Sequence, residues 1–269
     1  STWERCEGFL FGPVDADEYD PETDTWPVNF TDMDALLASA QPLTPSDIEA
    51  LTSRSLKGYH PIEYILWGQG GTRTAASLTA RQKEYVVSLS IHLKSQADQL
   101  YNSWIASGGN YANRFLNAGT GSTDFVKKQD AFLAITDGLV GICGEVGDGK
   151  MKDPFDNMDP QIVESPFSGN SITDFKNNII GAFNVYKGNF NEDAVGLQDL
   201  VKLRNSALNV QIEQKFNTAI NSFSAITSSF EQAIISQRTQ CQATMTALND
   251  LSALLDTDLR AFVITNITD

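Results

Sequence analysis

The sequence predicts an all-α protein made of two helical bundles packed together. Apolar residues recur at three- and four-residue steps along most of the 269 residues, as amphipathic helices require. No segment shows sustained apolar–polar alternation flanked by hairpin turns, so we expect almost no sheet. The length suits two modest domains, and residues 117–122 are rich in Gly, Thr and Ser. We therefore predict an N-terminal bundle over residues 1–118 and a C-terminal bundle over residues 119–269.

The first half is expected to contain three short helices and one long helix. The apolar segment at the start reads as a helix already under way, so we expect an upstream helix to be missing. Thr44 followed by Pro45 is typical of a capped helix start. The long helix carries a stripe that includes Leu89, Leu93 and Leu100. The four expected helices cover residues 3–11, 45–57, 61–67 and 79–107.

The second half has more regular periodicity. Ser171 is expected to cap one helix, and Gly188 to end it. Wide apolar stripes of this kind are typical of helices that pack into bundles. The stripes predict four helices within residues 125–146, 171–187, 208–226 and 241–262.

Composition excludes several classes of function. The formal net charge of −15 disfavours nucleic acid and anionic lipid surfaces as partners, because both would be repelled. The three cysteines form no C-x-x-C pair, which argues against a zinc ribbon or a thioredoxin-type site. No apolar run reaches the roughly 18–20 residues of a transmembrane helix. We therefore expect no nucleic-acid partner and no transmembrane helix.

Two motif-like segments are interpreted as structural. Residues 144–150 match most of a phosphate-binding loop, but Met151 stands where Ser or Thr must supply a hydroxyl to magnesium. We therefore expect a helix end followed by a turn there. Residues 15–20 hold four carboxylates but lack the Gly of a calcium EF-hand loop. A solvated acidic loop is the expected structure.

The chain contains only two histidines, His60 and His92, which limits metal chemistry. The H-E-x-x-H motif of zinc peptidases is absent. His92 lies on the apolar stripe of the long helix, so we interpret it as a hydrogen-bonded core histidine. A role at a domain interface is the alternative.

His60 and Glu63 are three residues apart and share one face if both are helical. An imidazole and a carboxylate at this spacing can bind one metal ion when other oxygens complete the site. A structural role is the alternative. With Pro61 at the first helical position, His60 would be the N-cap and Glu63 would close a capping box.

This motif, Gly58-Tyr59-His60-Pro61-Ile62-Glu63, is accompanied by other segments in a consistent order along the chain. With them, the chain resembles the imelysin family of bacterial cell-envelope proteins. Pro61 departs from the pattern, because a small or apolar residue without an imino ring is expected there. The accompanying segments are Trp3-Glu4 with Glu7, residues 9–13, 24–27, 66–68 and 164–168, then Ser171, Asp174-Phe175, Asn178 and residues 186–188.

The resemblance implies two helical bundles with a site between them around the His-x-x-Glu motif. It implies His60 and Glu63 as metal ligands. Glu7, Asp24 and Glu164 are candidate additional carboxylates, and Ser168 and Asp174 are further candidates for ligand binding. Oxygen-rich sites suit iron(III), calcium or manganese better than copper(I). The cofactor could be iron, zinc or calcium, or none.

The function that the resemblance implies is binding of a metal ion or small polar ligand in the cell envelope, linked to iron acquisition. The protein would be periplasmic or lipid-anchored, with an iron-uptake component as a candidate partner. A metallopeptidase that holds zinc through His60 and Glu63 is one alternative, although no general base can be named. A structural or partner-binding module without catalysis is the other.

Overall fold

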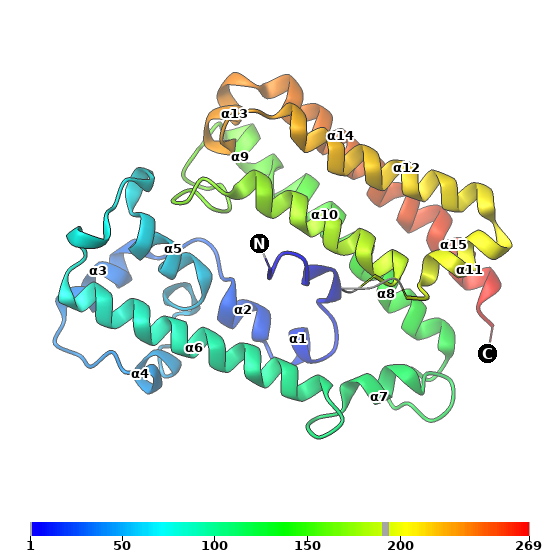
Figure 1. The fold of residues 1–269 in the computed structure, drawn as a ribbon, viewed down its shortest axis with the longest axis horizontal. Helices are drawn as coiled ribbons and strands as arrows, with labels where there is room; N and C mark the ends of the chain where they lie inside the picture. The colour runs from blue at the N-terminus through cyan, green and yellow to red at the C-terminus, as the bar shows by residue number, and fades with distance from the viewer. Residues whose placement is uncertain (1, 190–193, 269) are drawn as a thin grey trace. The chain divides into compact units, whose positions relative to one another are not determined.

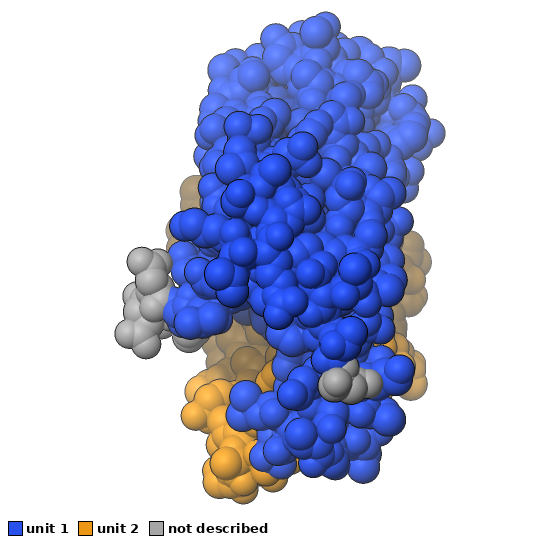
Figure 2. Space-filling view, turned by 90° about the vertical axis from the view of Figure 1, so that its right-hand side faces the viewer, with its two compact units in different colours: residues 1–11, 112–163, 170–269 blue, residues 12–111, 164–169 orange. Residues whose placement is uncertain are grey.

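A computed structural model describes residues 2–189 and 194–268. Helices make up 70% of it, and the described residues contain no strand, which confirms the all-α prediction. The chain forms two compact units, shown in Figure 2. Unit 1 comprises residues 1–11, 112–163 and 170–269, and unit 2 comprises residues 12–111 and 164–169.

The two units are not two consecutive halves of the sequence. The chain passes from unit 1 into unit 2 at Gly12 and leaves it after Tyr111, a few residues before the boundary expected at 118. It then contributes a short segment, Glu164–Gly169, to unit 2 from within the second half. The prediction that residues 1–118 and 119–269 form two separate domains stays a prediction.

Unit 1 is built on four helices that run side by side in Figure 1, namely α8, α10, α12 and α14. Their apolar stripes meet in one core. Phe175 packs edge-on against Phe230 at 5.2 Å between ring centroids, and Phe183 stacks on Phe216 at 4.7 Å. The four helices span Lys128–Gly144, Ser171–Lys187, Ser206–Ser222 and Arg238–Leu254.

Shorter elements complete unit 1. The segment after α8 continues as a π-helix, η5 (Glu145–Lys150), and a second π-helix, η7 (Leu255–Leu259), follows α14. The expected helix end and turn at 144–150 is therefore wrong, but the segment is helical and forms no phosphate-binding loop. The other elements are η1 Glu7–Phe9, α9 Lys152–Asn157, α11 Leu197–Arg204, η6 Phe223–Ala225, α13 Phe230–Ser236 and α15 Arg260–Asn266; α7 Tyr111–Leu116 starts at the last residue of unit 2 and continues into unit 1.

Unit 2 is organised around the long helix α6 (Ala80–Trp104), against which α1 to α5 pack. Thr79 caps α6 in a reciprocal capping box with Gln82. Tyr85 and Leu89 of α6 are fully buried in the core of this unit. The surrounding elements are α1 Pro13–Ala16, α2 Tyr19–Thr23, α3 Phe30–Ala38, α4 Pro45–Glu49, η2 Arg54–Leu56, α5 Tyr59–Trp67, η3 Gln69–Gly71 and η4 Ala75–Ser77.

Several predicted helix bounds are corrected. Residues 3–11 form turns and the short η1 rather than a helix. Thr44 caps α4 as predicted, but α4 ends at Glu49, whose carbonyl accepts a hydrogen bond from Lys57 Nζ. Asn170, not Ser171, is the N-cap of α10. None of the helices in the described part of the chain has both the length and the hydropathy of a membrane span.

Candidate functional site

The start of α5 is fixed by a close backbone approach within unit 2. Gly58, its N-cap residue, has φ +80° and ψ −153°, in the region that favours glycine. A Cβ atom at Gly58 would lie 1.9 Å from the carbonyl oxygen of Thr23. Glycine is therefore required here, and this contact brings the residue after Thr23, Asp24, beside the first turn of α5.

The helix start corrects the capping interpretation of the motif. Because α5 begins at Tyr59 with Gly58 as N-cap, His60 is the second helical residue and Pro61 the third. Gly58 itself makes no side-chain capping bond. Proline is tolerated at that position, because the first N–H groups of a helix have no intrahelical acceptor. His60 and Glu63 are therefore free of any capping role.

The imidazole of His60 lies among carboxylates and is only 4% exposed. Its Nε2 atom is 3.3 Å from Oδ1 of Asp24 and 4.0 Å from Oε1 of Glu164. Its Nδ1 atom is 3.8 Å from Oε2 of Glu63. The two ring nitrogens therefore face different carboxylates, with Asp24 and Glu164 on one side and Glu63 on the other.

Glu63 is held in place by the short segment that returns to unit 2. Its Oε1 atom accepts hydrogen bonds from the backbone N–H of Ser168 at 2.8 Å and from Ser168 Oγ at 2.6 Å. These bonds leave Oε2 facing His60. Because Glu164 and Ser168 both belong to the segment Glu164–Gly169, this segment supplies one carboxylate near His60 and orients another.

Aromatic side chains pack around the histidine and the returning segment. The indole of Trp26 lies 4.8 Å from the imidazole of His60 between ring centroids. Phe167, 3% exposed, packs against Trp26 at 6.1 Å and Tyr64 at 5.0 Å. These contacts cover one side of the His60 ring and pack against the residue that precedes Ser168.

The carboxylates determine the charge state of His60. Burial alone would lower its pKa, because a buried cation loses hydration. The neighbouring carboxylates of Asp24, Glu63 and Glu164 outweigh burial and raise the pKa of His60 to about 10. Without another cation, His60 is therefore an imidazolium ion at neutral pH, surrounded by three acidic groups.

The group also fits a metal ion. Ligand atoms of Asp24, His60 and Glu164 all lie within 4.8 Å of one another. Ligand atoms around zinc lie about 3.4 Å apart, so small shifts of these side chains would close such a site. In addition, His60 Nε2 and Glu63 Oε2 are among the buried side-chain atoms of the described residues that have no aligned hydrogen-bond partner, as is His92 Nδ1. Buried polar atoms without partners are rare in proteins and call for an explanation such as a bound ion.

Comparison with known proteins identifies the family. The sequence profile of the imelysins matches residues 1–257. The chain belongs to the imelysin family. Iron-regulated protein A of Synechococcus elongatus is 31% identical over 259 residues, which is 95% of this chain and 68% of that relative. The predicted resemblance is thereby confirmed.

Two solved structures extend the comparison. A protein described as an iron-regulated protein A precursor from Parabacteroides distasonis is 25% identical, with a TM-score of 0.85 over 99% of this imelysin and 80% of that chain. An imelysin peptidase from Bacteroides ovatus is 27% identical, with a TM-score of 0.56 over 64% of this chain and 51% of that one. The fold of this imelysin is thus shared over nearly its whole length with the first of these.

Two other residues proposed for the site belong to unit 1 of this imelysin. Glu7 is 3% exposed, accepts a hydrogen bond from Asn178 Nδ2 and lies 3.3 Å from Lys150 Nζ. Asp174 of α10 accepts a hydrogen bond from Asn170 Nδ2 at 2.6 Å. Both carboxylates thus have partners in unit 1, whereas Asp24, His60, Glu63, Glu164 and Ser168 come together in unit 2.

His92 is a buried polar residue of the unit 2 core, as predicted. It is 2% exposed, and its Nε2 atom lies 3.0 Å from Oε2 of Glu49. Gln96 Nε2 donates to the same Glu49 oxygen at 3.2 Å. His92 is therefore the hydrogen-bonded core histidine expected from its position on the α6 stripe.

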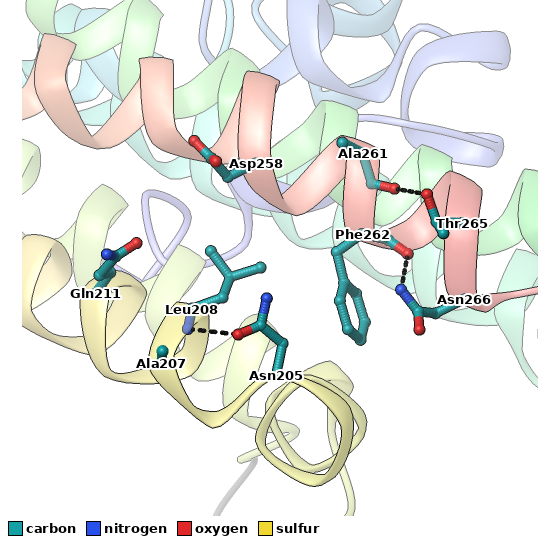
Figure 3. Close-up of a pocket in the computed structure, with 9 residues that line it drawn as sticks. All are labelled: Asn205, Ala207, Leu208, Gln211, Asp258, Ala261, Phe262, Thr265 and Asn266. Carbon is teal, nitrogen blue, oxygen red and sulfur yellow. Dashed lines mark hydrogen bonds between the residues drawn. The ribbon is translucent and has the colours of Figure 1, made fainter.

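Unit 1 also contains an open cavity of about 450 Å³ between α12 and the C-terminal helices, shown in Figure 3. Leu208 and Phe262 form its apolar part. Asp258 is the only carboxylate among its lining residues, so the cavity lacks the converging ligands that surround His60. The lining residues are Asn205, Ala207, Leu208, Gln211, Asp258, Ala261, Phe262, Thr265 and Asn266.

Sequence reasoning did not identify two contributors to the His60 site. Trp26 was part of a matching segment, but nothing in its local sequence indicates that its ring packs against His60. Gly58 belongs to the motif, yet its contact with Thr23 joins segments distant in sequence. A glycine directly before a helix is the one signal that could have indicated such a close approach.

Proposed function

We propose that this imelysin binds a metal ion through Asp24, His60 and Glu164, and that it serves iron handling rather than peptide hydrolysis. One observation carries the proposal. A buried imidazole nitrogen, His60 Nε2, lacks an aligned hydrogen-bond partner and faces two carboxylates from segments far apart in the sequence. A polar group buried in this way is costly unless a partner satisfies it.

The pair formed by Glu63 and Ser168 supports the same role. Metal-bound histidines usually direct their second ring nitrogen to a carboxylate or carbonyl group, which fixes the ring and raises its basicity. Here Nδ1 of His60 faces Glu63, and Ser168 holds Glu63 through two hydrogen bonds. We therefore assign Glu63 to orienting His60, with Nε2 as the ligand atom.

The donor set narrows the choice of metal. Imidazole suits iron and zinc, and carboxylates suit hard ions such as manganese and calcium. One nitrogen with two carboxylates therefore favours iron, with zinc and manganese as competitors, over copper(I). A bound ion would supply a compact positive charge at the place where protonated His60 otherwise balances the carboxylates.

The relatives support a link to iron and to the cell envelope. The Synechococcus relative is named for its regulation by iron, and the Parabacteroides relative is described as a precursor. We propose that this chain likewise works in the envelope, periplasmic or lipid-anchored, beside an iron-uptake component. Fractionation of cells that express the full-length protein, with an immunoblot of each fraction, tests the location.

Metal titration tests the site. Protein purified without chelator is analysed for its metal content, stripped, and titrated with iron(III), zinc and calcium. We expect one ion per chain in the wild type. Asp24→Asn and His60→Asn should both stay folded and bind much more weakly, because each removes a ligand atom without adding bulk.

Asp34→Asn is the matched control, since it removes the same charge from an exposed position on α3. Its affinity should equal that of the wild type. Equal affinities for all four proteins would remove Asp24 and His60 as ligands. An absence of binding by the wild type would leave the structural or partner-binding alternative.

A further inference from the structure

An ion pair between a buried lysine and a partly buried glutamate lies next to the proposed metal ligands in the sequence. Lys57 is 4% exposed, and its Nζ atom donates to Oε2 of Glu22 at 2.8 Å and to the carbonyl oxygen of Glu49 at 3.0 Å. Glu22 also accepts from Arg54 Nε at 3.0 Å. Partial burial works against ionisation of Glu22, but Lys57 and Arg54 outweigh it and lower the pKa of its carboxyl. The pair is therefore ionic at neutral pH.

The pair is the first of three successive contacts between two segments of unit 2. Glu22 meets Lys57 through the ion pair. The next residue, Thr23, meets Gly58 through the backbone contact that only glycine permits. Beyond these, the Asp24 carboxylate meets His60. Because each contact is one or two residues from the next along both segments, the ion pair limits how far Asp24 can move from His60.

We infer that Lys57 and Glu22 are positioning residues for the proposed metal site, holding the Asp24 segment against the His60 segment although neither provides a ligand atom. The inference rests on the proposed function. Glu49 adds to the constraint, because its carbonyl fixes the ammonium group from the end of α4. Lys57 is thereby held by two elements, α2 and α4, and transmits their position to the start of α5.

The direction in which one substitution changes the metal affinity distinguishes a positioning role from a purely electrostatic one. Lys57→Met removes a positive charge near a cation site, so charge alone predicts tighter binding of a metal ion. Loss of positioning predicts weaker binding, by about 10- to 100-fold, the range found when residues that support metal ligands are mutated. The two explanations therefore predict opposite changes in affinity.

The experiment measures the affinity of Mn²⁺ and Zn²⁺ for the stripped, full-length chain. We expect Lys57→Met to bind both ions more weakly than the wild type, Glu22→Gln to show a smaller loss, and Lys57→Arg to recover most of the affinity. Arg238→Met is the control for stability alone. It removes a cation from unit 1 that donates to the carbonyls of Phe155 and Ile234, and its affinity should be unchanged.

A second readout needs no metal. The chain has two histidines, so the imidazole NMR signals of His60 can be resolved in the metal-free protein. They should shift in Lys57→Met and Glu22→Gln but not in Arg238→Met. Affinity equal to or tighter than the wild type, or unchanged His60 signals in folded Lys57→Met and Glu22→Gln, would overturn the inference. If the wild type binds neither ion, the metal proposal fails, and the His60 signals still decide the positioning role.

Discussion

Glu63 lies between His60 and Ser168, with Oε2 3.8 Å from Nδ1 of His60 and Oε1 bonded twice to Ser168. This arrangement replaces a local explanation of the Gly-x-His-x-x-Glu motif with a tertiary one. Glu63 does not close a capping box at the start of its own helix, since the N-cap is Gly58, which makes no side-chain capping bond. It links the imidazole to a segment that comes from more than a hundred residues further along the chain.

Glu63→Gln tests this linking role. Glutamine can still accept hydrogen bonds from Ser168, so the fold should be retained. The negative charge opposite Nδ1 is lost, and metal affinity should fall by about 10- to 100-fold. Isothermal titration with zinc measures the change. Ser168→Ala is a milder variant, because the hydrogen bond from its backbone N–H to Glu63 remains. It should show a smaller loss of metal affinity. Unchanged affinity in Glu63→Gln would leave the carboxylate without a role at the metal.

Gly58→Ala should destabilise unit 2 strongly. The added Cβ would combine left-handed backbone strain with a contact of 1.9 Å to the Thr23 carbonyl. Strain of this kind alone costs roughly 1–3 kcal/mol, and we expect the clash to bring the total above about 2 kcal/mol. Urea denaturation of Gly58→Ala and the wild type measures the loss in the free energy of unfolding.

Gly70→Ala is the matched control for Gly58→Ala. Gly70 also has a positive φ, of +74°, but no atom of the described residues lies within 4 Å of the position that its Cβ would occupy. Gly70→Ala should lower the free energy of unfolding by about 1 kcal/mol, from backbone strain alone. Equal losses for the two variants would show that the approach of Gly58 to Thr23 does not constrain the fold.

We predict no peptidase activity against unfolded or insulin-like substrates. Zinc peptidases need a metal and a separate base to activate water. Among the described residues around His60, Asp24 and Glu164 face Nε2, and Glu63 is engaged with Ser168 and Nδ1. None of these carboxylates therefore remains available to act as the general base. Cleavage by the pure protein that is sensitive to chelator and lost in His60→Ala would contradict this prediction.

The sequence predicted the elements that depend on local patterns. The stripes through Phe175 and Phe216 gave helices α10 and α12, because burial of one face repeats with the helical period. Thr44 marked a helix start, because an N-cap acts only on its own first turn. The two π-helices were not predicted, since their registers depend on packing between helices rather than on local sequence.

The candidate site follows from the family resemblance rather than from local patterns. That resemblance named Glu7 together with Asp24, Glu164 and Ser168, and in the structure Glu7 lies in unit 1 with Lys150 and Asn178. The start of α5 was misplaced by two residues for a related reason. Proline is a strong local signal, whereas the contact of Gly58 with the Thr23 carbonyl exists only in the folded chain.

The last prediction concerns the pH dependence of stability in the metal-free protein. The pKa of His60 is raised from 6.5 to about 10 by its carboxylate neighbours, although burial opposes the change. Between these values the native state holds a proton that the unfolded state releases, so stability must fall as pH rises. The contribution is fully present below pH 6.5 and is lost through about pH 10, with a slope of at most about 1.4 kcal/mol per pH unit.

Other groups titrate in the same window, so the comparison must isolate His60. Burial raises the pKa of the Cys143 thiol to about 12 and that of Cys241 to about 11. Because both thiols ionise more readily in the unfolded state, they also lower the free energy of unfolding as pH rises. Their effect cancels in the difference between wild type and His60→Gln. Urea denaturation of both proteins with chelator, from below pH 6.5 to about 10, should show the stability difference shrinking as pH rises. A difference that stays constant would mean that His60 is not held as an imidazolium ion, and that metal binding releases no proton from it.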